Sequence, residues 1–433
     1  MKTQRIVRVL GASMALVLAA CGSDAKPAAV STPKTTETLT TAAQTTPTPV
    51  TDSGAQNTTA DSVAVEDTTA VADTAGAGAG DLGAGEGELN IIVWAGYAED
   101  GSTDPAVDWV TPFEDETGCA VNVKIGNSSD EMVQLMQSGE YDGVSASGDA
   151  TTRLIEGAEV AEIDTDLIPN YADVFEGLKL KPWNSVDGKP YGVPHGRGAN
   201  LLVYNTETFT TAPDSMSVMF DPAGPAAGGV SVYDSAIYIA DAALYLMATQ
   251  PDLGITNPYA LDQTQFDAAL ALLGEQEGIA SQYWALYTDQ QAELEAGTVL
   301  AGTTWQVIVS LAEANGAKIA ATKPKEGATG WSDTWMLSTK AKHPNCMYMW
   351  MNHIISPEAN SQVAEWFGEA PSNAKACDLT SDGFCDAFHA EDDGYWDDVW
   401  YWTTATEKCL DGRTDVACVP YEEWVTAWAE LRA

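Results

Sequence analysis

From residue 89 onward the sequence alternates between segments typical of strands and segments typical of helices. Residues 89–94 (LNIIVW) form a continuous apolar run, which favours a strand buried on both faces. Residues 106–117 then carry apolar side chains at helical spacing, Gly118 follows as a helix stop, and residues 121–125 alternate as a second strand. This order predicts an α/β fold with doubly wound sheets, which bind ligands at the carboxyl ends of their strands.

The same alternation returns further along the chain. Residues 229–233 (GVSVY) predict a strand that leads into a helix over 235–247, and residues 298–305 predict another strand followed by a helix. Residues 356–368 have a serine cap, a proline in the first turn and a terminal glycine, and residues 421–431 have an amphipathic pattern. This part of the chain is too long for a single hydrophobic core, so we expect two lobes.

The beginning of the chain has the pattern of an export signal. Three basic residues precede an apolar run over 9–20, which is typical of a signal peptide over 1–20 and too short to span a bilayer as a helix. The run ends in Leu-Ala-Ala before Cys21, which resembles the lipobox of bacterial lipoproteins. We therefore expect a lipid on Cys21; the alternative is an ordinary cleavable signal peptide that happens to contain a cysteine.

Residues 21–88 have few large apolar side chains and are dominated by Ala, Thr, Ser, Pro and Gly. Such a segment cannot bury enough surface to offset the entropy lost on ordering. We expect the lipidated cysteine and a disordered tether here. The resulting location is the outer face of the cytoplasmic membrane, either periplasmic or at the cell surface.

The chain is strongly acidic, with a formal net charge of −43 spread along its length. This charge repels nucleic acid and excludes it as a partner. Two explanations stay open. The charge attracts a cationic ligand, or it keeps an exported protein soluble in a saline medium.

Six cysteines remain once Cys21 is assigned to the lipid, and an exported chain favours disulfides over metal ligation. The cysteines at 377 and 385 are near enough in sequence to form a local disulfide, and so are those at 409 and 418. The remaining two cysteines, at 119 and 346, would then form the third disulfide. No C-x-x-C occurs and the four histidines lie far apart, so we expect neither zinc nor a cofactor. The disulfide cysteines are Cys119, Cys346, Cys377, Cys385, Cys409 and Cys418.

The order of segments from about residue 89 to residue 375 resembles the spermidine/putrescine-binding proteins of bacterial ABC transporters. Each segment alone is a weak signal, whereas the ordered set at matching spacing is specific. The segments are LNIIVWAGY, FEDETGCAVNV, GEYDGVSASGD, KPYGVPHGRGANLLVYN, GTVLAGTTWQ, PKEGATGWSDTWMLSTKAKHP and HIISPEANSQVAEWFGEAPSN.

The resemblance implies a two-lobed periplasmic-binding-protein fold of type II, in which each lobe has a doubly wound sheet. Lobe 1 is expected over 89–198 and 332–375, and lobe 2 over 199–331 and 376–433. Strands that cross between the lobes form the hinge, and the lobes close on the ligand. The implied partner is a membrane permease, and we expect a monomer without enzymatic activity.

The resemblance also points to ligand-binding positions. An ammonium over an indole face gains about 0.5 to 2 kcal/mol, so aromatic walls with one carboxylate suit an amine. Packing in the core is the alternative role for each tryptophan. The matching positions are the aromatic walls Trp94, Tyr97, Trp305 and Trp331, the polar contact Ser147, and the carboxylate Asp333.

Several positions depart from the family's pattern. Ser235 and Tyr238 stand where the family has acidic residues, while Asp149 and Glu369 replace aromatic residues. Arg197 also stands at an aromatic position; a cation there would repel an amine and pair with a carboxylate or phosphonate. A salt bridge from this arginine to either of those acids, or simple exposure, is the alternative.

These residues predict a receptor that traps a small amine-bearing solute, such as spermidine or putrescine, in the cleft between lobes. A zwitterionic, amino-acid-like solute or a sugar is the alternative ligand. A secreted glycoside hydrolase is the alternative from another class, because paired carboxylates and aromatic side chains also describe a sugar-cleaving site. No carboxylate pair in the sequence is marked out for that chemistry.

Overall fold

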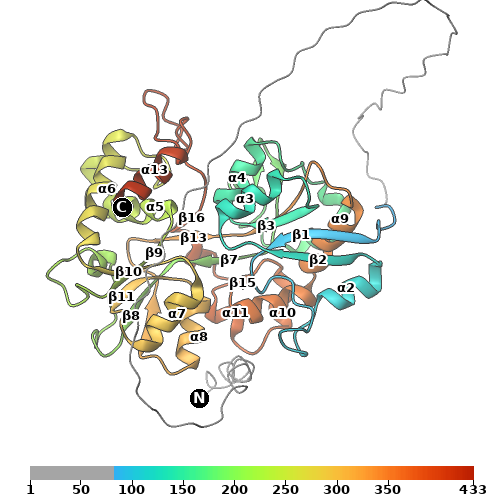
Figure 1. The fold of residues 1–433 in the computed structure, drawn as a ribbon, viewed down its shortest axis with the longest axis horizontal. Coiled ribbons are helices and arrows are strands. Elements are labelled where there is room, and N and C mark those ends of the chain that lie inside the picture. The colour runs from blue at the N-terminus through green and yellow to red at the C-terminus, as the bar shows by residue number, and fades with distance from the viewer. Residues whose placement is uncertain (1–81) are drawn as a thin grey trace, which may run out of the picture. The chain divides into compact units, whose positions relative to one another are not determined.

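The computed structural model describes residues 82–433, which belong to one compact unit (Figure 1). The predicted signal peptide, the predicted lipid site at Cys21 and most of the predicted tether lie outside the described residues. None of the helices within 82–433 combines the length and the hydropathy that a membrane span requires.

The first sheet contains the strand predicted at the start of the alternation. Its order is β2-β1-β3-β14-β6; β1 pairs in parallel with β2 and β3, and β14 runs antiparallel to β3 and β6. The strands are β1 (Glu88–Val93), β2 (Ala120–Ile125), β3 (Gly143–Ala146), β14 (Thr334–Leu337) and β6 (Val193–Pro194). The associated helices are α2 (Val110–Thr117), α3 (Ser129–Gln137), α4 (Gly148–Glu156), α9 (Pro344–Ile354) and α10 (Pro357–Phe367).

Strand β1 is buried on both faces, as its continuous apolar run predicts. Leu89, Ile91 and Val93 pack in the hydrophobic cluster that includes α9, whereas Ile92 packs in the cluster that includes α3. The alternation of side chains across a strand explains this division. Strand β2 is an edge strand, and its Val123 is therefore 40% exposed.

The second sheet has the order β10-β9-β11-β8-β12 and is likewise covered by helices on both faces. Its strands are β8 (Leu201–Asn205), β9 (Val230–Tyr233), β10 (Ala280–Trp284), β11 (Ala301–Thr304) and β12 (Ile319–Thr322). Its helices are α5 (Ile239–Thr249), α6 (Gln263–Glu277), α7 (Tyr287–Ala296), α8 (Gln306–Ala314) and α13 (Tyr421–Leu431).

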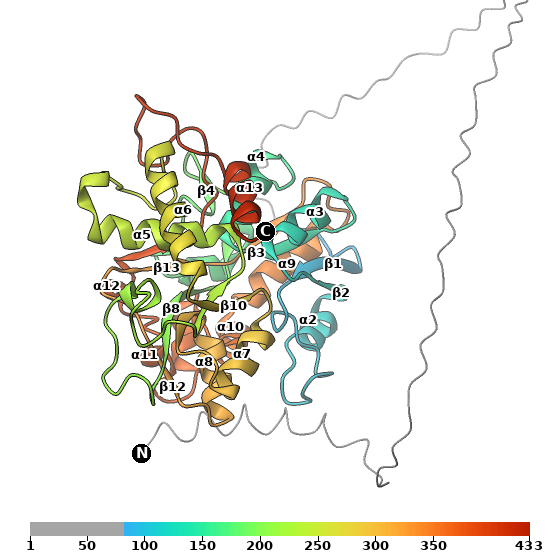
Figure 2. The same ribbon diagram turned by 60° about the vertical axis from the view of Figure 1, so that its left-hand side comes forward.

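A third sheet, here called the crossing sheet, lies between the other two (Figures 1 and 2). β7 links β6 of the first sheet to β8 of the second, and β13 leads directly into β14. The chain therefore passes between the two larger sheets along these strands. In the order of the sheet, the strands are β15 (Ala370–Pro371), β7 (Gly196–Ala199), β13 (Ala328–Trp331) and β16 (Val399–Tyr401). The short elements nearby are α11 (Phe384–Ala387), α12 (Asp393–Trp396), β4 (Ser185–Val186) and β5 (Lys189–Pro190).

Most of the predicted elements are present, with shifted boundaries. The helix expected from residue 106 begins at Val110, with Trp109 as its N-cap residue; just before it, Asp108 Oδ1 accepts a hydrogen bond from the N–H of Thr111. The helix expected over 235–247 splits into a 3-10 turn, Ala236–Tyr238, and α5. Gly118 ends α2 in the left-handed conformation that favours glycine, as predicted.

The three predicted disulfides are present. Cys119–Cys346 joins the start of β2 to α9, whereas Cys377–Cys385 and Cys409–Cys418 close loops of eight and nine residues. The first bond spans 227 residues, so it removes far more freedom from the unfolded chain than the local bonds do.

We predict that replacing Cys119 and Cys346 together by serine lowers the free energy of unfolding by about 2–5 kcal/mol. Urea unfolding followed by tryptophan fluorescence measures this change. The matched control replaces Cys377 and Cys385, which close a short loop, and the loss there should be smaller. Equal losses in the two double variants would contradict the loop-length argument.

Candidate functional site

Two buried carboxylates, Asp333 and Glu369, lie together near the crossing sheet and are here called the acid pair. The Tyr97 hydroxyl lies 2.8 Å from Asp333 Oδ2 and 3.3 Å from Glu369 Oε2, within hydrogen-bonding distance of both. The Ser147 hydroxyl donates to Asp333 Oδ1 at 2.5 Å. All four residues are at most 3% exposed. The structure thus brings together four positions that the sequence places far apart.

The fold explains why these residues meet. Ser147 directly follows β3, and Tyr97 lies in the loop after the neighbouring β1, so the carboxyl ends of two parallel strands supply both. Asp333 lies in the short connection between β13 and β14. Glu369 is accommodated by Gly196 of β7, because a Cβ at that position would overlap its carboxylate.

His195 is the closest basic side chain to the acid pair, and it is neutral. Its Nδ1 accepts a hydrogen bond from Trp335 Nε1, so the single proton of the neutral ring belongs on Nε2. That nitrogen lies 3.3 Å from Glu369 Oε1, without hydrogen-bond geometry. Burial lowers the pKa of His195 to about 3, which keeps the ring uncharged at neutral pH.

The acid pair is therefore electrostatically uncompensated. Burial raises the pKa of Asp333 to about 6, and burial together with the nearby Asp333 raises the pKa of Glu369 well above its usual range. Within residues 82–433, neither carboxylate has a Lys or Arg at ion-pair distance. A bound cation would supply the missing charge.

We predict that the unliganded protein loses stability as the pH rises from about 4 to about 8. The folded-state pKa of Asp333 lies above the unfolded value of about 3.9, so its contribution is full below that value and is lost as the pH rises through about 6. Asp333→Asn should remove up to about 3 kcal/mol of this loss. Thermal unfolding at a series of pH values measures it.

The control for this measurement is Glu140→Gln, which removes one carboxylate at an exposed position. It should leave the slope of stability against pH as in the parent protein. A slope that Asp333→Asn leaves unchanged would contradict the burial of an uncompensated acid there.

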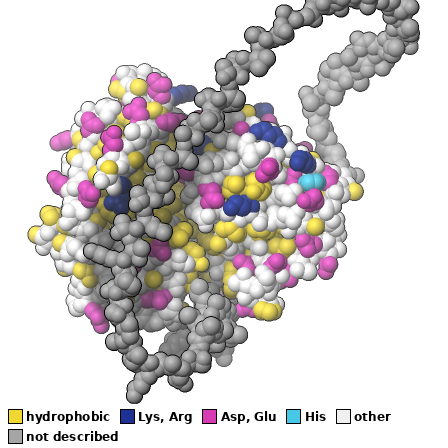
Figure 3. All heavy atoms as spheres, in the orientation of Figure 1, with side chains coloured by type: hydrophobic (Ala, Val, Ile, Leu, Met, Phe, Trp, Pro, Cys, Tyr) yellow, Lys and Arg dark blue, Asp and Glu magenta, His cyan; other side chains and the backbone are white. Residues whose placement is uncertain are grey.

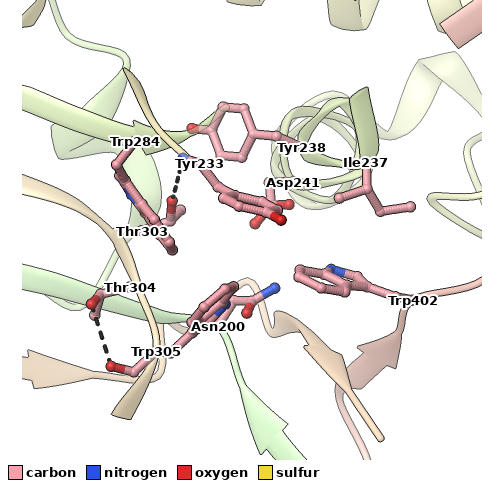
Figure 4. Close-up of a pocket in the computed structure, with 10 residues that line it drawn as sticks. All are labelled: Asn200, Tyr233, Ile237, Tyr238, Asp241, Trp284, Thr303, Thr304, Trp305 and Trp402. Atoms are coloured by element: carbon pink, nitrogen blue, oxygen red, sulfur yellow. Dashed lines mark hydrogen bonds between the residues drawn. The ribbon is translucent and has the colours of Figure 1, made fainter. Parts of the chain in front are cut away.

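A small cavity in the second sheet has aromatic walls (Figure 4). The Tyr233 ring stacks in parallel with Trp402 at 5.8 Å between centroids, and it lies 5.5 Å from the ring of Trp305 and 4.8 Å from that of Trp284. The free volume of the cavity is about 10 Å³, room for about one water. The lining residues are Asn200, Tyr233, Ile237, Tyr238, Asp241, Trp284, Thr303, Thr304, Trp305 and Trp402.

Asp241 of α5 supplies a carboxylate to this cavity. Its Oδ1 accepts a hydrogen bond from the Thr329 hydroxyl at 2.9 Å, and burial raises its pKa to about 7. Asn200 Oδ1, also at the cavity, is buried without a hydrogen-bond partner. Sequence reasoning missed Asp241, although an acid in the apolar helix IADAALYL was a signal of burial.

The acid pair and the aromatic cavity are linked by packed rings. Phe367 lies 4.7 Å from the Tyr97 ring and 5.9 Å from the Trp331 ring. Trp331, Phe367, Trp305 and Trp402 all belong to one hydrophobic cluster. One hydrophobic cluster thus includes aromatic rings near the acid pair and aromatic rings of the cavity.

The other aromatic positions have separate surroundings. Trp331 packs over Gly198, where a Cβ would overlap its ring, and Trp94 is half-buried between the two hydrophobic clusters of the first sheet. Tyr238 lines the cavity, but its hydroxyl accepts a hydrogen bond from Gln276 Nε2 at 3.1 Å. Ser235 directly precedes the 3-10 turn before α5 and is not among the cavity-lining residues.

Arg197 lies on the opposite face of β7 from the acid pair. Gly196 and Gly198 leave room for Glu369 and Trp331 on one face, so the residue between them projects from the other. There its guanidinium donates to the Ala390 carbonyl at 3.0 Å and stacks on Trp396 at 4.2 Å.

Neither salt bridge considered for Arg197 is present in residues 82–433. Asp149 accepts a hydrogen bond from the Ser129 hydroxyl at 3.0 Å, and the charge of Arg153 acts on it. Glu369 faces Tyr97 and His195 instead. Acidic side chains are scattered over the visible face of the molecule in Figure 3, which matches the even spread of charge along the sequence.

Residues 108–391 match the family of bacterial extracellular solute-binding proteins. The chain therefore belongs to this family, whose members are solute-binding receptors. The matched region includes the acid pair and most of the aromatic cavity, and residues 392–433 lie beyond it.

Individual relatives are distant. Spermidine/putrescine-binding periplasmic protein 1 of Haemophilus influenzae is 24% identical over 296 residues, covering 66% of this chain and 75% of that protein. The putrescine-binding periplasmic protein PotF of Escherichia coli is 24% identical over 317 residues, covering 70% and 82%.

Solved structures share the fold. The spermidine/putrescine ABC transporter substrate-binding protein PotD of Streptococcus pneumoniae superposes with a TM-score of 0.63 at 17% identity, over 80% of this chain and 97% of that one. MotA of A. tumefaciens B6, in complex with glucopine, gives 0.60 at 19% identity, over 80% and 100%. These matches confirm the two-lobed periplasmic-binding-protein fold of type II; the predicted residue boundaries of the lobes stay a prediction.

Proposed function

We propose that this protein is the solute receptor of an ABC importer and binds a small amine-bearing solute between its lobes. The observation that carries the proposal is the acid pair, two buried carboxylates without a cationic side chain to compensate them. Leaving a buried charge unpaired costs several kcal/mol, and a bound ammonium group would recover that cost.

The surroundings of the acid pair suit an ammonium ion. Asp333 and Glu369 offer several acceptor oxygens, and the Glu369 Oε1 atom has no hydrogen-bond partner of its own. The aromatic rings that lead to the cavity would contact the hydrocarbon part of an amine, with cation–π attraction of about 0.5 to 2 kcal/mol for its charge. Asp241 would then be available to a second amino group at the far end.

A polyamine fits this arrangement better than a zwitterion. The relatives named for spermidine and putrescine support that choice. Arg197, the cation that favoured an acidic group on the solute, projects away from the acid pair and is stacked on Trp396. It would not meet a carboxylate bound beside Asp333. We propose a binding role without catalysis, in keeping with the solute-binding family to which the chain belongs.

The export features complete the proposal. Lobe 1 (89–198 and 332–375) and lobe 2 (199–331 and 376–433) would close about β7 and β13, and the closed monomer would deliver its solute to a membrane permease. A lipid on Cys21 would hold the receptor at the membrane, and residues 22–88 would give it reach.

We predict that the protein binds putrescine or spermidine in calorimetric titration and that Asp333→Asn weakens binding at least about 30-fold. The reason is that removing one partner of a desolvated charge pair costs about 2–5 kcal/mol. The control is Glu313→Gln, which alters an exposed acid at the end of α8 opposite to Trp305. Absence of binding to every polyamine, or an undiminished affinity in Asp333→Asn, would refute the amine assignment.

We predict that Cys21→Ser moves the protein from the membrane fraction to the soluble fraction of cells that express it. The lipid would be the membrane attachment, so without it the protein would lose that affinity. Fractionation followed by immunoblotting measures the shift, and polyamine titration of the purified variant should match the parent protein. A variant that stays in the membrane fraction would disprove lipidation at this cysteine.

A further inference from the structure

The C-terminal segment 399–404, here called the wall segment, lies beyond the part of the chain that matches the family. Its strand β16 pairs in parallel with β13, with Gly330 opposite Tyr401. The next residue continues the pairing, because the N–H of Trp402 donates to the Gly330 carbonyl at 2.7 Å. The wall segment therefore forms the edge of the crossing sheet beside β13.

Trp402 extends from this edge into the aromatic cavity. Figure 4 shows its ring at the side of the cavity below Ile237, on a different segment of chain from Trp284 and Trp305. It stacks on Tyr233 with only 6° between the ring planes. The indole is buried, and its Nε1 has no hydrogen-bond partner.

The wall segment also contacts the helix that begins beside the acid pair. The Trp402 carbonyl lies so close to Gly148 that a Cβ there would overlap it. The Thr404 hydroxyl donates to the Asp149 carbonyl at 2.5 Å, and the hydroxyls of Thr403 and Thr152 lie 3.4 Å apart. The segment thus fills space between α4 of the first sheet and the cavity of the second.

The chain that follows holds the wall segment in place. The Cys409–Cys418 disulfide packs against Ala260, and Arg413 Nη2 donates to the Ala260 carbonyl at 2.5 Å. Arg413 Nη1 also donates to Asp262 at 2.9 Å. These contacts fix the segment to the second sheet's helices, so Trp402 is a rigid feature of the cavity.

We propose that Trp402 is a specificity-determining residue that limits the length of the solute, an inference that rests on the proposed amine-binding function. With the indole in place the cavity has only about 10 Å³ free, room for about one water and far below the range of about 300–1,000 Å³ usual for ligand pockets. A solute that reaches past the acid pair must therefore displace the rings of this cavity, and each added methylene competes for the volume that the indole occupies.

The test is the affinity for straight-chain α,ω-diamines of increasing length, from putrescine upward, together with spermidine. The parent protein should prefer a short diamine. Trp402→Ala should shift the preference toward longer chains, by about tenfold in relative affinity for each additional methylene accommodated. Trp402→Phe, which retains a ring and guards against misfolding, should shift it in the same direction by less.

Trp428→Phe is the matched control, because Trp428 is equally buried but bonds to Asp234 and does not line the cavity. Its length preference should equal that of the parent protein. An unchanged preference in folded Trp402→Ala and Trp402→Phe would overturn the inference while leaving amine binding intact. A parent protein that binds no amine would instead overturn the proposed function, and this inference with it.

Discussion

The centre of this molecule contains two buried acids that have no cationic side chain beside them. Asp333 and Glu369 are buried beside each other, and the groups that reach them are a phenol, a hydroxyl and a neutral imidazole. None of these groups supplies a positive charge, and the raised pKa values of the two acids mean that the unliganded pair retains a proton instead. The surrounding fold must therefore supply the stability that the acid pair lacks, and it does so through two sheets with extensive hydrophobic clusters on both faces. The positive charge that the fold does not provide beside the acid pair is the charge that an amine solute would bring.

Local signals predicted most of the architecture. The apolar run of β1, the glycine that ends α2 and the serine-proline start of α10 all depend on a few neighbouring residues, and all are present. Boundaries shifted where neighbouring residues took another local conformation, as at the start of α2 and in the 3-10 turn that precedes α5. The disulfide pairing was predictable because two of the pairs are local and only one pair then remained.

The candidate site was predictable only in part. The resemblance placed Tyr97, Ser147 and Asp333, which the structure brings into contact. The direction of Arg197 depends on the register of β7 against β15, which no local pattern in the sequence encodes. Asp241 and Trp402 were missed for different reasons. The first is a single acid within an apolar helix, whose partner Thr329 is distant in sequence, and the second belongs to a segment beyond the resemblance whose position depends on long-range pairing with β13.

The alternation of β7 has a wider consequence. Arg197 pairs with Ala370, the residue next to Glu369. The positively charged arginine is therefore only one residue along the sheet from a carboxylate that has no cationic partner. Only the odd-even alternation of a four-residue strand keeps them apart, with a bare glycine on each side of the arginine. The alternation of side chains along β7 thus decides whether a solute at the acid pair meets a negative or a positive electrostatic potential. A slip of one position would exchange the two faces and turn an attractive site for cations into a self-neutralised one.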